Sequence, residues 1–331
     1  MHVLLLVLGL QQLIQAQQTD SAVYYFQKAQ EAQQQRRFKV AEQCISKSFS
    51  FEKKDVELYL AWGNILLDLR NYALAYEKFK LAEGVDPSNP LVIRSLAELS
   101  FNLHQYGPAI QYAQQMMDRK IGKGAALMLA RAYYETSQYA KAIRSCEAAF
   151  KDDTTLAEPS YIAARSFMEI QQYKNAALCF EQALAKDTNN VRWMYETAMS
   201  WYAVPDDKKS LYWMEKARDK GHPQTYDFLQ NLSTAYMNAG FPEKSLEILL
   251  GQLSQKSDDP TLIYTIADTY FKAKKYDEAI QYWNRCLQLD PKNAQALYMT
   301  GICYIRKGEQ VKGQQLCDKA LAMDPSIRQR L

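Results

Sequence analysis

The 331-residue sequence is poor in the residue types that usually carry out chemistry. It contains three histidines, and none of them has the spacing that would pair it with a nucleophile or with metal ligands. The sequence also lacks a phosphate-binding glycine-rich loop, a Gly-x-Ser-x-Gly elbow and a His-Glu-x-x-His helix. We therefore expect no catalytic residues, no metal and no cofactor.

An excess of charge of one sign is also missing. The 40 Lys and Arg residues are nearly balanced by 37 Asp and Glu residues, which leaves a formal net charge of +3. This charge is too small for a long-range field that would attract nucleic acid or an anionic membrane. After the N-terminus, no apolar run approaches the roughly 20 residues that a membrane-spanning helix needs. We expect neither a nucleic-acid partner nor a transmembrane segment.

The N-terminal stretch differs from the rest of the sequence. An unbroken apolar run extends from Val3 to Leu10, and a signal-peptidase site can be placed after Ala16. No Lys or Arg precedes the run, and Ile14 is larger than the small residue preferred at that position. The sequence predicts that residues 1–16 are a signal peptide and that the mature chain is periplasmic or secreted. In the alternative, the stretch is an apolar helix packed on the residues that follow, and the protein is a cytosolic adaptor.

Residues 260–291 have the pattern of a helix pair. An apolar set at helical spacing follows Pro260, and a second set ends before Asp290 and Pro291. Only the polar turn 272–276 separates the two sets, and so short a turn requires antiparallel helices. The apolar positions are Ile263, Ile266, Ala267, Tyr270, Ala279, Ile280, Trp283, Cys286 and Leu287.

The same pattern recurs about every 34 residues along nearly the whole sequence, and it resembles the tetratricopeptide repeat. That repeat combines small, tyrosine and other aromatic residues at fixed offsets with a closing proline. Counted in this way, nine repeats begin near residues 22, 56, 90, 123, 157, 191, 226, 260 and 294. The clearest early copy contains Trp62, Gly63, Ala75, Phe79, Ala82 and Pro87.

The resemblance implies an all-α fold, a right-handed α-solenoid superhelix of about 18 helices in antiparallel pairs. A solenoid shares one thin core between neighbouring repeats, so residues 17–331 are expected to form a single domain. Lys28 stands where the second repeat has Trp62, and Gln314 stands where the eighth has Ile280, which predicts polar end caps. Residues 326–331 are too few for a further helix of consequence.

The six cysteines occupy small or apolar positions of the repeat, and none has Cys-x-x-Cys spacing. Free cysteine is among the most buried residue types, so we expect buried free thiols. A disulfide framework is the alternative for an exported chain.

In tetratricopeptide arrays, the first helices of the repeats line a concave groove that holds an extended peptide or a partner helix. Residues beside the core stripe of these helices include Arg94, Glu98, Phe101 and Leu127. Tyrosine and arginine are common interface anchors because tyrosine buries a large area and arginine pairs bidentately with carboxylates. The predicted partner-binding residues are Arg131, Tyr134, Tyr161, Arg165, Arg192, Tyr195 and Tyr202.

Two alternatives apply to these groove residues. Arg131 and Arg165 each precede a glutamate by four residues, Glu135 and Glu169, so their charges could be satisfied within their own helices. Some of the tyrosines could instead pack against the next repeat. The family's best-known groove clamps a C-terminal carboxylate with lysines and asparagines. This groove is not reproduced here, because Asn64 is an isolated match and the following repeats lack the basic partners.

The sequence thus predicts a non-catalytic scaffold or adaptor that binds a protein or peptide in its groove. The alternative is a hydrolytic or carbohydrate-acting enzyme with a site spread over the groove. Such an enzyme would need several converging acids, whereas the groove stripe contains aromatic residues and arginines.

Overall fold

The computed structural model describes residues 21–51 and 55–329. The predicted signal segment, residues 1–16, lies outside these ranges. Within them the chain is helical and contains no β-strand. No helix in the described part of the chain has the length and the apolar character needed to cross a membrane.

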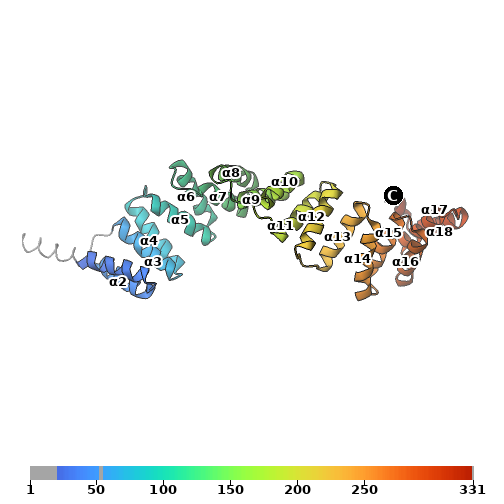
Figure 1. Cartoon of the computed structure of the whole chain (residues 1–331), viewed down its shortest axis with the longest axis horizontal. Coiled ribbons are helices and arrows are strands. Elements are labelled where there is room, and N and C mark those ends of the chain that lie inside the picture. The colour runs from blue at the N-terminus through green and yellow to red at the C-terminus, as the bar shows by residue number, and fades with distance from the viewer. Residues whose placement is uncertain (1–20, 52–54, 330–331) are drawn as a thin grey trace, which may run out of the picture. The chain divides into compact units, whose positions relative to one another are not determined.

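The helices follow one another along the chain with short turns between them (Figure 1). The first covers residues 21–34 in its described part. The other helices are α2 (Phe38–Phe51), α3 (Val56–Asp68), α4 (Tyr72–Val85), α5 (Pro90–Asn102), α6 (Tyr106–Asp118), α7 (Ala125–Glu135), α8 (Tyr139–Asp152), α9 (Glu158–Glu169), α10 (Tyr173–Leu184), α11 (Val191–Tyr202), α12 (Asp207–Asp219), α13 (Tyr226–Asn238), α14 (Pro242–Gln255), α15 (Pro260–Lys272), α16 (Tyr276–Leu289), α17 (Ala294–Arg306), α18 (Gln310–Met323) and the 3-10 helix η1 (Pro325–Gln329).

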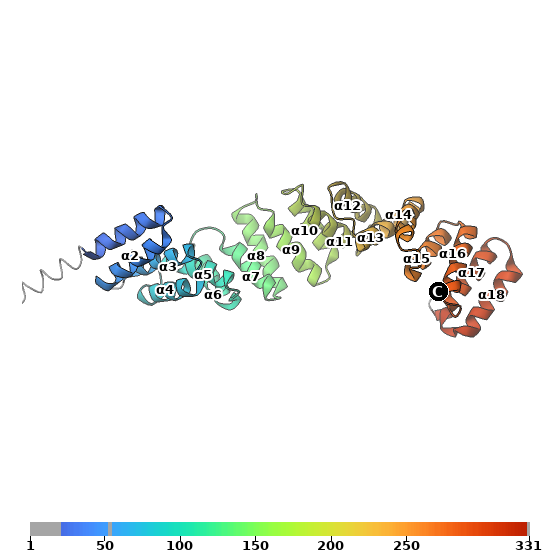
Figure 2. The same ribbon diagram turned by 90° about the horizontal axis from the view of Figure 1, so that it is seen from below.

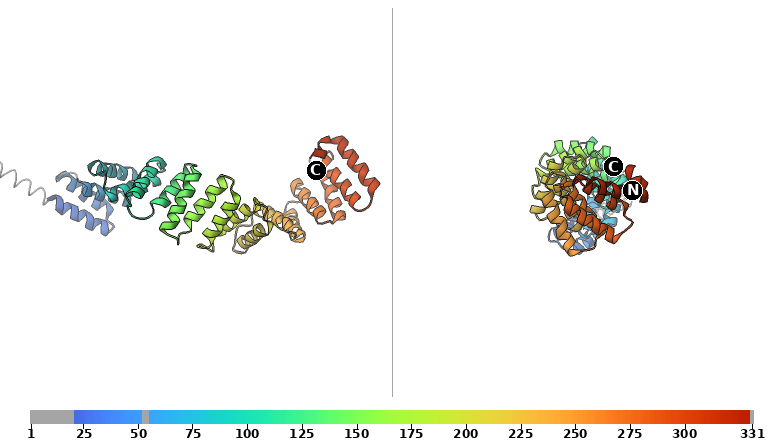
Figure 3. Two further views of the ribbon diagram at one scale, coloured as in Figure 1. Left: turned by 90° about the horizontal axis from the view of Figure 1, so that it is seen from above. Right: turned by 90° about the vertical axis from the view of Figure 1, so that its right-hand side faces the viewer.

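The chain divides into two compact units, with the boundary in the sequence between Ile170 and Gln171. In the N-terminal unit, up to Ile170, α3 packs on α4, α5 on α6 and α7 on α8 (Figure 2). In the C-terminal unit, from Gln171 onward, α11 packs on α12, α13 on α14 and α15 on α16. The last pair, α17 and α18, is drawn in red in Figure 3.

The first helices of the pairs begin at residues 56, 90, 125, 158, 191, 226, 260 and 294. Each start lies within two residues of the start expected from the sequence repeat. The predicted all-helical fold of antiparallel pairs is therefore confirmed.

The turns inside most pairs contain a residue in the left-handed backbone region. In one such turn the Arg70 amide donates to the Leu67 carbonyl at 2.9 Å, and the Asn71 amide donates to the Leu66 carbonyl at 2.8 Å. This is the Schellman arrangement, which satisfies the last carbonyls of a helix and usually places glycine at the left-handed residue. Here six pairs use other residues, with φ between 57° and 60°: Arg36, Arg70, His104, Ser137, Gln171 and Lys274.

The core consists of small residues at the helix contacts and large residues around them. In the N-terminal unit Phe79 is fully buried, and a Cβ added to Gly63 would overlap its ring. In the C-terminal unit the apolar positions predicted for residues 260–291 pack into one cluster. Ile263, Ala267 and Trp283 are each 0% exposed, which confirms the sequence interpretation of this pair.

All six cysteines are free thiols, as expected from their positions in the repeat. Cys146, Cys286, Cys303 and Cys317 are buried, and Cys44 and Cys179 are partly buried. Burial raises the pKa of the thiols of Cys179, Cys286 and Cys303 to about 11.

The final pair differs from the others in its helix contact and in its tail. Gly301 of α17 faces Gly313 of α18, and a Cβ on either one would lie within 2.7 Å of the other's carbonyl oxygen. The tail also has a larger role than the sequence indicated. Ile327 of η1 is fully buried and packs with Ala294 and Ala320, so the tail completes the core of the last pair.

Candidate functional site

Four of the predicted groove residues lie on α7 and α9 of the N-terminal unit, and Arg131 makes the strongest contact among them. Its Nε donates to Oε1 of Glu158 at 2.6 Å, and its Nη2 donates to Oε2 of the same carboxylate. Glu158 is the first residue of α9, so this bidentate pair joins the first helices of two successive repeats. The partner is therefore Glu158 and not Glu135, the same-helix residue considered from the sequence.

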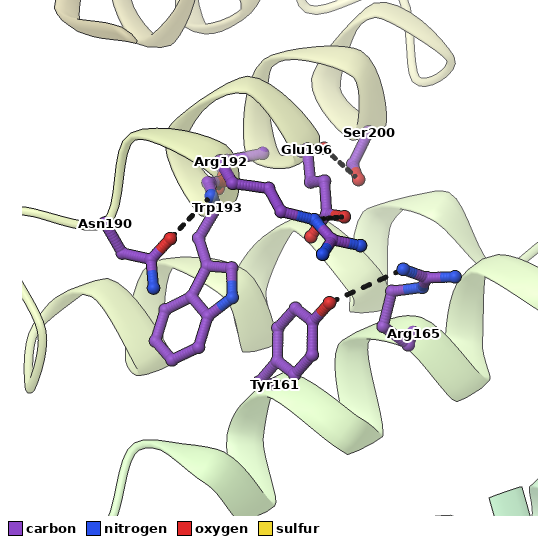
Figure 4. Close-up of polar contacts among 8 residues, drawn as sticks. Tyr161, Arg165, Asn190, Arg192, Trp193, Glu196 and Ser200 are labelled. Carbon is purple, nitrogen blue, oxygen red and sulfur yellow. Dashed lines mark hydrogen bonds and ion pairs between the residues drawn. The ribbon is translucent and has the colours of Figure 1, made fainter. Parts of the chain in front are cut away.

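Of the other three residues of this group, Tyr134 and Tyr161 lie beside the guanidinium of the third, Arg165. Nη1 of Arg165 donates to the Tyr161 hydroxyl at 3.4 Å (Figure 4), and the guanidinium lies 6.0 Å from the Tyr134 ring centroid. The Tyr134 ring also makes an edge contact with Tyr139 at 5.9 Å. Burial raises the pKa of Tyr134 above its usual value. The structure thus brings Tyr134, Tyr161 and Arg165 together as the sequence predicted.

The three predicted residues of the C-terminal unit lie in different surroundings. Nε of Arg192 donates to Glu196 of the same helix at 3.1 Å (Figure 4). Tyr202 is 43% exposed near the end of α11.

Tyr195 packs against the next repeat, which is the alternative considered for some of the groove tyrosines. Its hydroxyl accepts a hydrogen bond from Asn231 at 2.7 Å, and its ring lies against His222 and Phe228 with centroid separations of 4.8 and 5.5 Å. These contacts give Tyr195 a structural role between α11 and α13.

A cleft of about 370 Å³ lies in the N-terminal unit among α5, α6 and α7. Its lining includes five residues of the groove stripe, which is the strongest agreement between the predicted surface and the structure. Sequence reasoning missed Met116 of α6 and Lys123 and Gly124 of the α6–α7 turn, because the stripe was read on the first helices alone. The full lining is Arg94, Glu98, Phe101, Asn102, Met116, Lys123, Gly124, Leu127, Met128 and Arg131.

The cleft combines an apolar base with a charged rim. Met116 is 2% exposed, and the Phe101 ring is held by an edge contact with Tyr106 at 5.6 Å. On the rim, Nε of Arg94 donates to Glu98 at 2.9 Å across one turn of α5. Apolar surface with a few placed polar groups is the usual character of a ligand site.

Two further clefts lie in the C-terminal unit, and some of the polar side chains that line them have partners within the chain. In one, of about 480 Å³, the Tyr236 hydroxyl donates to Glu215 at 2.7 Å and accepts from Arg218 at 2.9 Å. The other, of about 580 Å³, is lined in part by Trp201 and Lys209. Contacts of this kind stabilise the fold and leave less capacity for a ligand.

Glu181 of α10 accepts two indole hydrogen bonds beside the larger of these clefts. Nε1 of Trp201 lies 2.9 Å and Nε1 of Trp213 lies 3.0 Å from the same carboxylate oxygen. One acidic side chain thus connects α11 and α12 to the preceding repeat.

The arrangement of titratable side chains offers no metal site in the described residues. No group of three or more His, Cys, Asp or Glu side chains in that part of the chain is placed to hold an ion. Among the described residues that line the α5–α7 cleft, Glu98 is the one carboxylate.

Models of the tetratricopeptide repeat match residues 161–224, 262–293 and 282–315. The chain is similar to a TPR repeat-containing protein of Methanocaldococcus jannaschii, with 27% identity over 85 residues. This match covers 26% of the chain and 15% of that relative's length.

Two solved structures are also similar to the chain. One is the C-terminal part of a TPR repeat-containing protein from Cytophaga hutchinsonii, with 19% identity, a TM-score of 0.51, and coverage of 72% of this chain and 98% of that one. The other is YrrB, described as a TPR protein with an unusual peptide-binding site, with 20% identity, a TM-score of 0.43, and coverage of 55% and 94%. The first likeness supports the fold. Residues 161–224 and 262–315 are thus identified as tetratricopeptide repeats, and the other helix pairs continue the same order of antiparallel helices.

Proposed function

We propose that this protein is a non-catalytic interaction scaffold that binds an extended segment of a partner protein in the α5–α7 cleft. The observation that carries the proposal is the lining of this cleft. The first helices α5 and α7 provide most of it, and five of its ten lining residues belong to the stripe that faces a partner in tetratricopeptide arrays.

The physical character of the cleft supports this function. Phe101, Leu127 and Met128 provide apolar surface, and the ion pair of Arg94 and Glu98 lies at the rim. Interfaces usually have this anatomy, with an apolar centre inside a polar, solvated edge. Tyr134, Tyr161 and Arg165 extend the proposed surface along α7 and α9, whereas Tyr195 supports the fold and is left out of it.

We further propose that the protein is exported by cleavage after Ala16 and acts in the periplasm or outside the cell. The apolar run from Val3 to Leu10 supports this proposal. N-terminal sequencing of the protein from its native compartment tests it, because a first residue of Gln17 is expected and a retained Met1 contradicts it.

Selection of a random peptide library on the immobilised full chain tests the binding function. We expect enriched peptides whose binding is weakened by about 1 kcal/mol or more when Phe101 is replaced by alanine, since truncating an aromatic anchor has a cost of this order. Phe150→Ala is the matched control, because Phe150 lies on α8, is 39% exposed and does not line the cleft.

Enriched peptides with equal affinity for the parent chain and Phe101→Ala would place the binding site elsewhere. Failure to enrich any peptide, or turnover of glycoside or peptide substrates by the purified chain, would count against the proposed function itself.

A further inference from the structure

Resting on this proposed function, we infer that the α5–α7 cleft selects a carboxylate that lies directly beside a large apolar side chain in the bound segment. The inference comes from the difference between the cationic groups of the cleft that already have a strong partner and those that remain available.

Arg131 is the least available of the three cations that line the cleft. Its Nε and Nη2 both donate to the Glu158 carboxylate, and the Arg131 and Glu158 side chains are each 41% exposed. Bidentate pairing of this kind is the strong form of a charge-assisted hydrogen bond. Arg131 therefore acts as a wall of the cleft, with its charge neutralised.

Lys123 is the most available cation. It is exposed in the α6–α7 turn, and among the described residues it makes no hydrogen bond and no close ion pair; its charge acts only at longer range, on Asp153, whose pKa it helps to lower. Its charge has no counterpart within the cleft, because the one lining carboxylate, Glu98, is paired with Arg94. A carboxylate from a ligand can pair with Lys123 without displacing another contact.

Arg94 supplies a second cation near the same turn. Its Nη1 lies 3.8 Å from the position that a Cβ on Gly122 would occupy, so the guanidinium reaches the loop that carries Lys123. Its ion pair with Glu98 is about half exposed on both sides, at 53% and 51%. An exposed pair one helical turn apart is weak and is screened by salt, so Arg94 can share its donors with an incoming anion.

The apolar part of the specificity comes from residues next to these cations. Phe101, Met116, Leu127 and Met128 are the large apolar residues that line the cleft. Methionine side chains adapt to apolar groups of different shape, which suits a large aliphatic or aromatic side chain without fixing its identity. The volume of about 370 Å³ is near the small end of the range for ligand sites, roughly 300–1,000 Å³, so one anchor and its neighbours fill it.

Other partner classes fit the cleft less well. A basic segment would be repelled by Lys123, which has no carboxylate partner among the described residues that line the cleft. Single-stranded nucleic acid is usually held by a cationic track with several aromatic stacking platforms. Phe101 is the one aromatic residue among the described residues that line this cleft.

The experiment starts from the tightest peptide that the random library yields and measures its affinity by fluorescence anisotropy. Its acidic residue beside the apolar anchor is then changed to the matching amide. We expect the amide peptide to bind about fivefold more weakly, the effect of losing one partly exposed ion pair. Lys123→Glu should reduce binding of the acidic peptide by at least this factor and remove its advantage over the amide peptide, because the new carboxylate repels the acidic side chain.

Lys39→Glu is the matched control, since Lys39 is exposed on α2 and the substitution changes the net charge by the same amount. It should leave both affinities unchanged.

A second pair of peptides separates the two sources of a carboxylate. One peptide has the acidic side chain and an amidated C-terminus, and the other has an amide side chain and a free C-terminus. If only the peptide with the acidic side chain binds, the carboxylate recognised by the cleft belongs to an internal acidic residue. If only the peptide with the free C-terminus binds, it belongs to the end of a chain.

Failure of the inference differs from failure of the proposed function. Peptides that bind through Phe101 but lack acidic residues, or that tolerate Lys123→Glu, would overturn the carboxylate preference and leave the scaffold function standing. Displacement of the peptides by a single-stranded oligonucleotide would overturn the preference in favour of nucleic acid. Absence of any Phe101-dependent peptide would remove both.

Discussion

Gly301 and Gly313 allow the backbones of α17 and α18 to approach closely, and substitution of Gly301 by alanine tests this contact. A Cβ at Gly301 would lie 2.7 Å from the Cys317 sulfur and 2.7 Å from the Gly313 carbonyl oxygen. The sulfur lies on a side chain that can shift, whereas the oxygen belongs to helix backbone. Gly301→Ala should therefore force the two helices apart.

Two opposing effects set the magnitude. Overpacking a well-packed contact costs about 1–3 kcal/mol, and the obstruction by backbone places Gly301 toward the upper end. Replacing glycine by alanine inside a helix contributes about 1 kcal/mol in the opposite direction. We expect Gly301→Ala to lower the local unfolding free energy of the last pair by about 1–2 kcal/mol.

Gly251 of α14 provides the matched control, because a Cβ there meets no atom within 4 Å. Gly251→Ala should raise the local stability by about 0.5–1 kcal/mol, since only the helix-propensity effect remains. Hydrogen exchange followed by mass spectrometry measures both variants in the full chain and resolves single helices. Repeat arrays interact through nearest neighbours, so each change should be confined to the pairs around it.

The two substitutions should thus have opposite signs, with faster exchange in α17 and α18 for one and slower exchange in α14 for the other. Unchanged or slower exchange in α17 and α18 of Gly301→Ala would refute the close approach as the reason for glycine at this position.

Two further predictions concern buried polar and titratable groups. Glu181→Ala should shift the tryptophan emission of the chain and destabilise the surrounding repeats by about 1–3 kcal/mol, because the indole N–H groups of Trp201 and Trp213 lose their acceptor. The control is Glu147→Ala, since Glu147 is exposed. Identical emission and melting curves for the parent chain and Glu181→Ala would contradict the prediction. The pKa of Cys179, Cys286 and Cys303 is raised to about 11, so these thiols should react slowly with iodoacetamide at pH 8 and become reactive as the pH rises toward 11 or when denaturant is added. Since the folded pKa lies above the ordinary value of 9.0, their contribution to stability is complete below pH 9 and is lost as the pH rises from there; rapid labelling of all three in the folded chain at pH 8 would contradict the assignment.

The helix pairs could be predicted from the sequence because the repeat specifies them several times over. Pro260 at the start of a helix and the small residues Ala267 and Ala279 mark the pattern, and the other pairs repeat it at nearly constant spacing. An error in one repeat is corrected by its neighbours. The conformations of the turns could not be predicted in the same way. Arg70 and His104 adopt left-handed φ values, whereas a reading of the sequence would expect glycine at such positions.

The candidate site was only partly predictable, because its contacts join different repeats. Spacing within α7 suggested Glu135 as the partner of Arg131, but the direction of the side chain leads to Glu158 on α9. The bond between Asn231 and Tyr195 likewise depends on how α11 and α13 are packed. Helical spacing gives the face on which a residue lies, and the partner on the next helix requires three-dimensional structure.

The bidentate pair of Arg131 and Glu158 also has a mechanical consequence. Neighbouring repeats can bend against each other because they share only a thin apolar contact, but this pair ties α7 directly to α9 at their polar faces. The ion pair lies away from the apolar contact about which the helices would bend, so a small change in the angle between the helices produces a large change in the distance between Arg131 and Glu158. The pair therefore resists bending beside the α5–α7 cleft, and the side of the cleft formed by α7 should change shape little when a ligand binds.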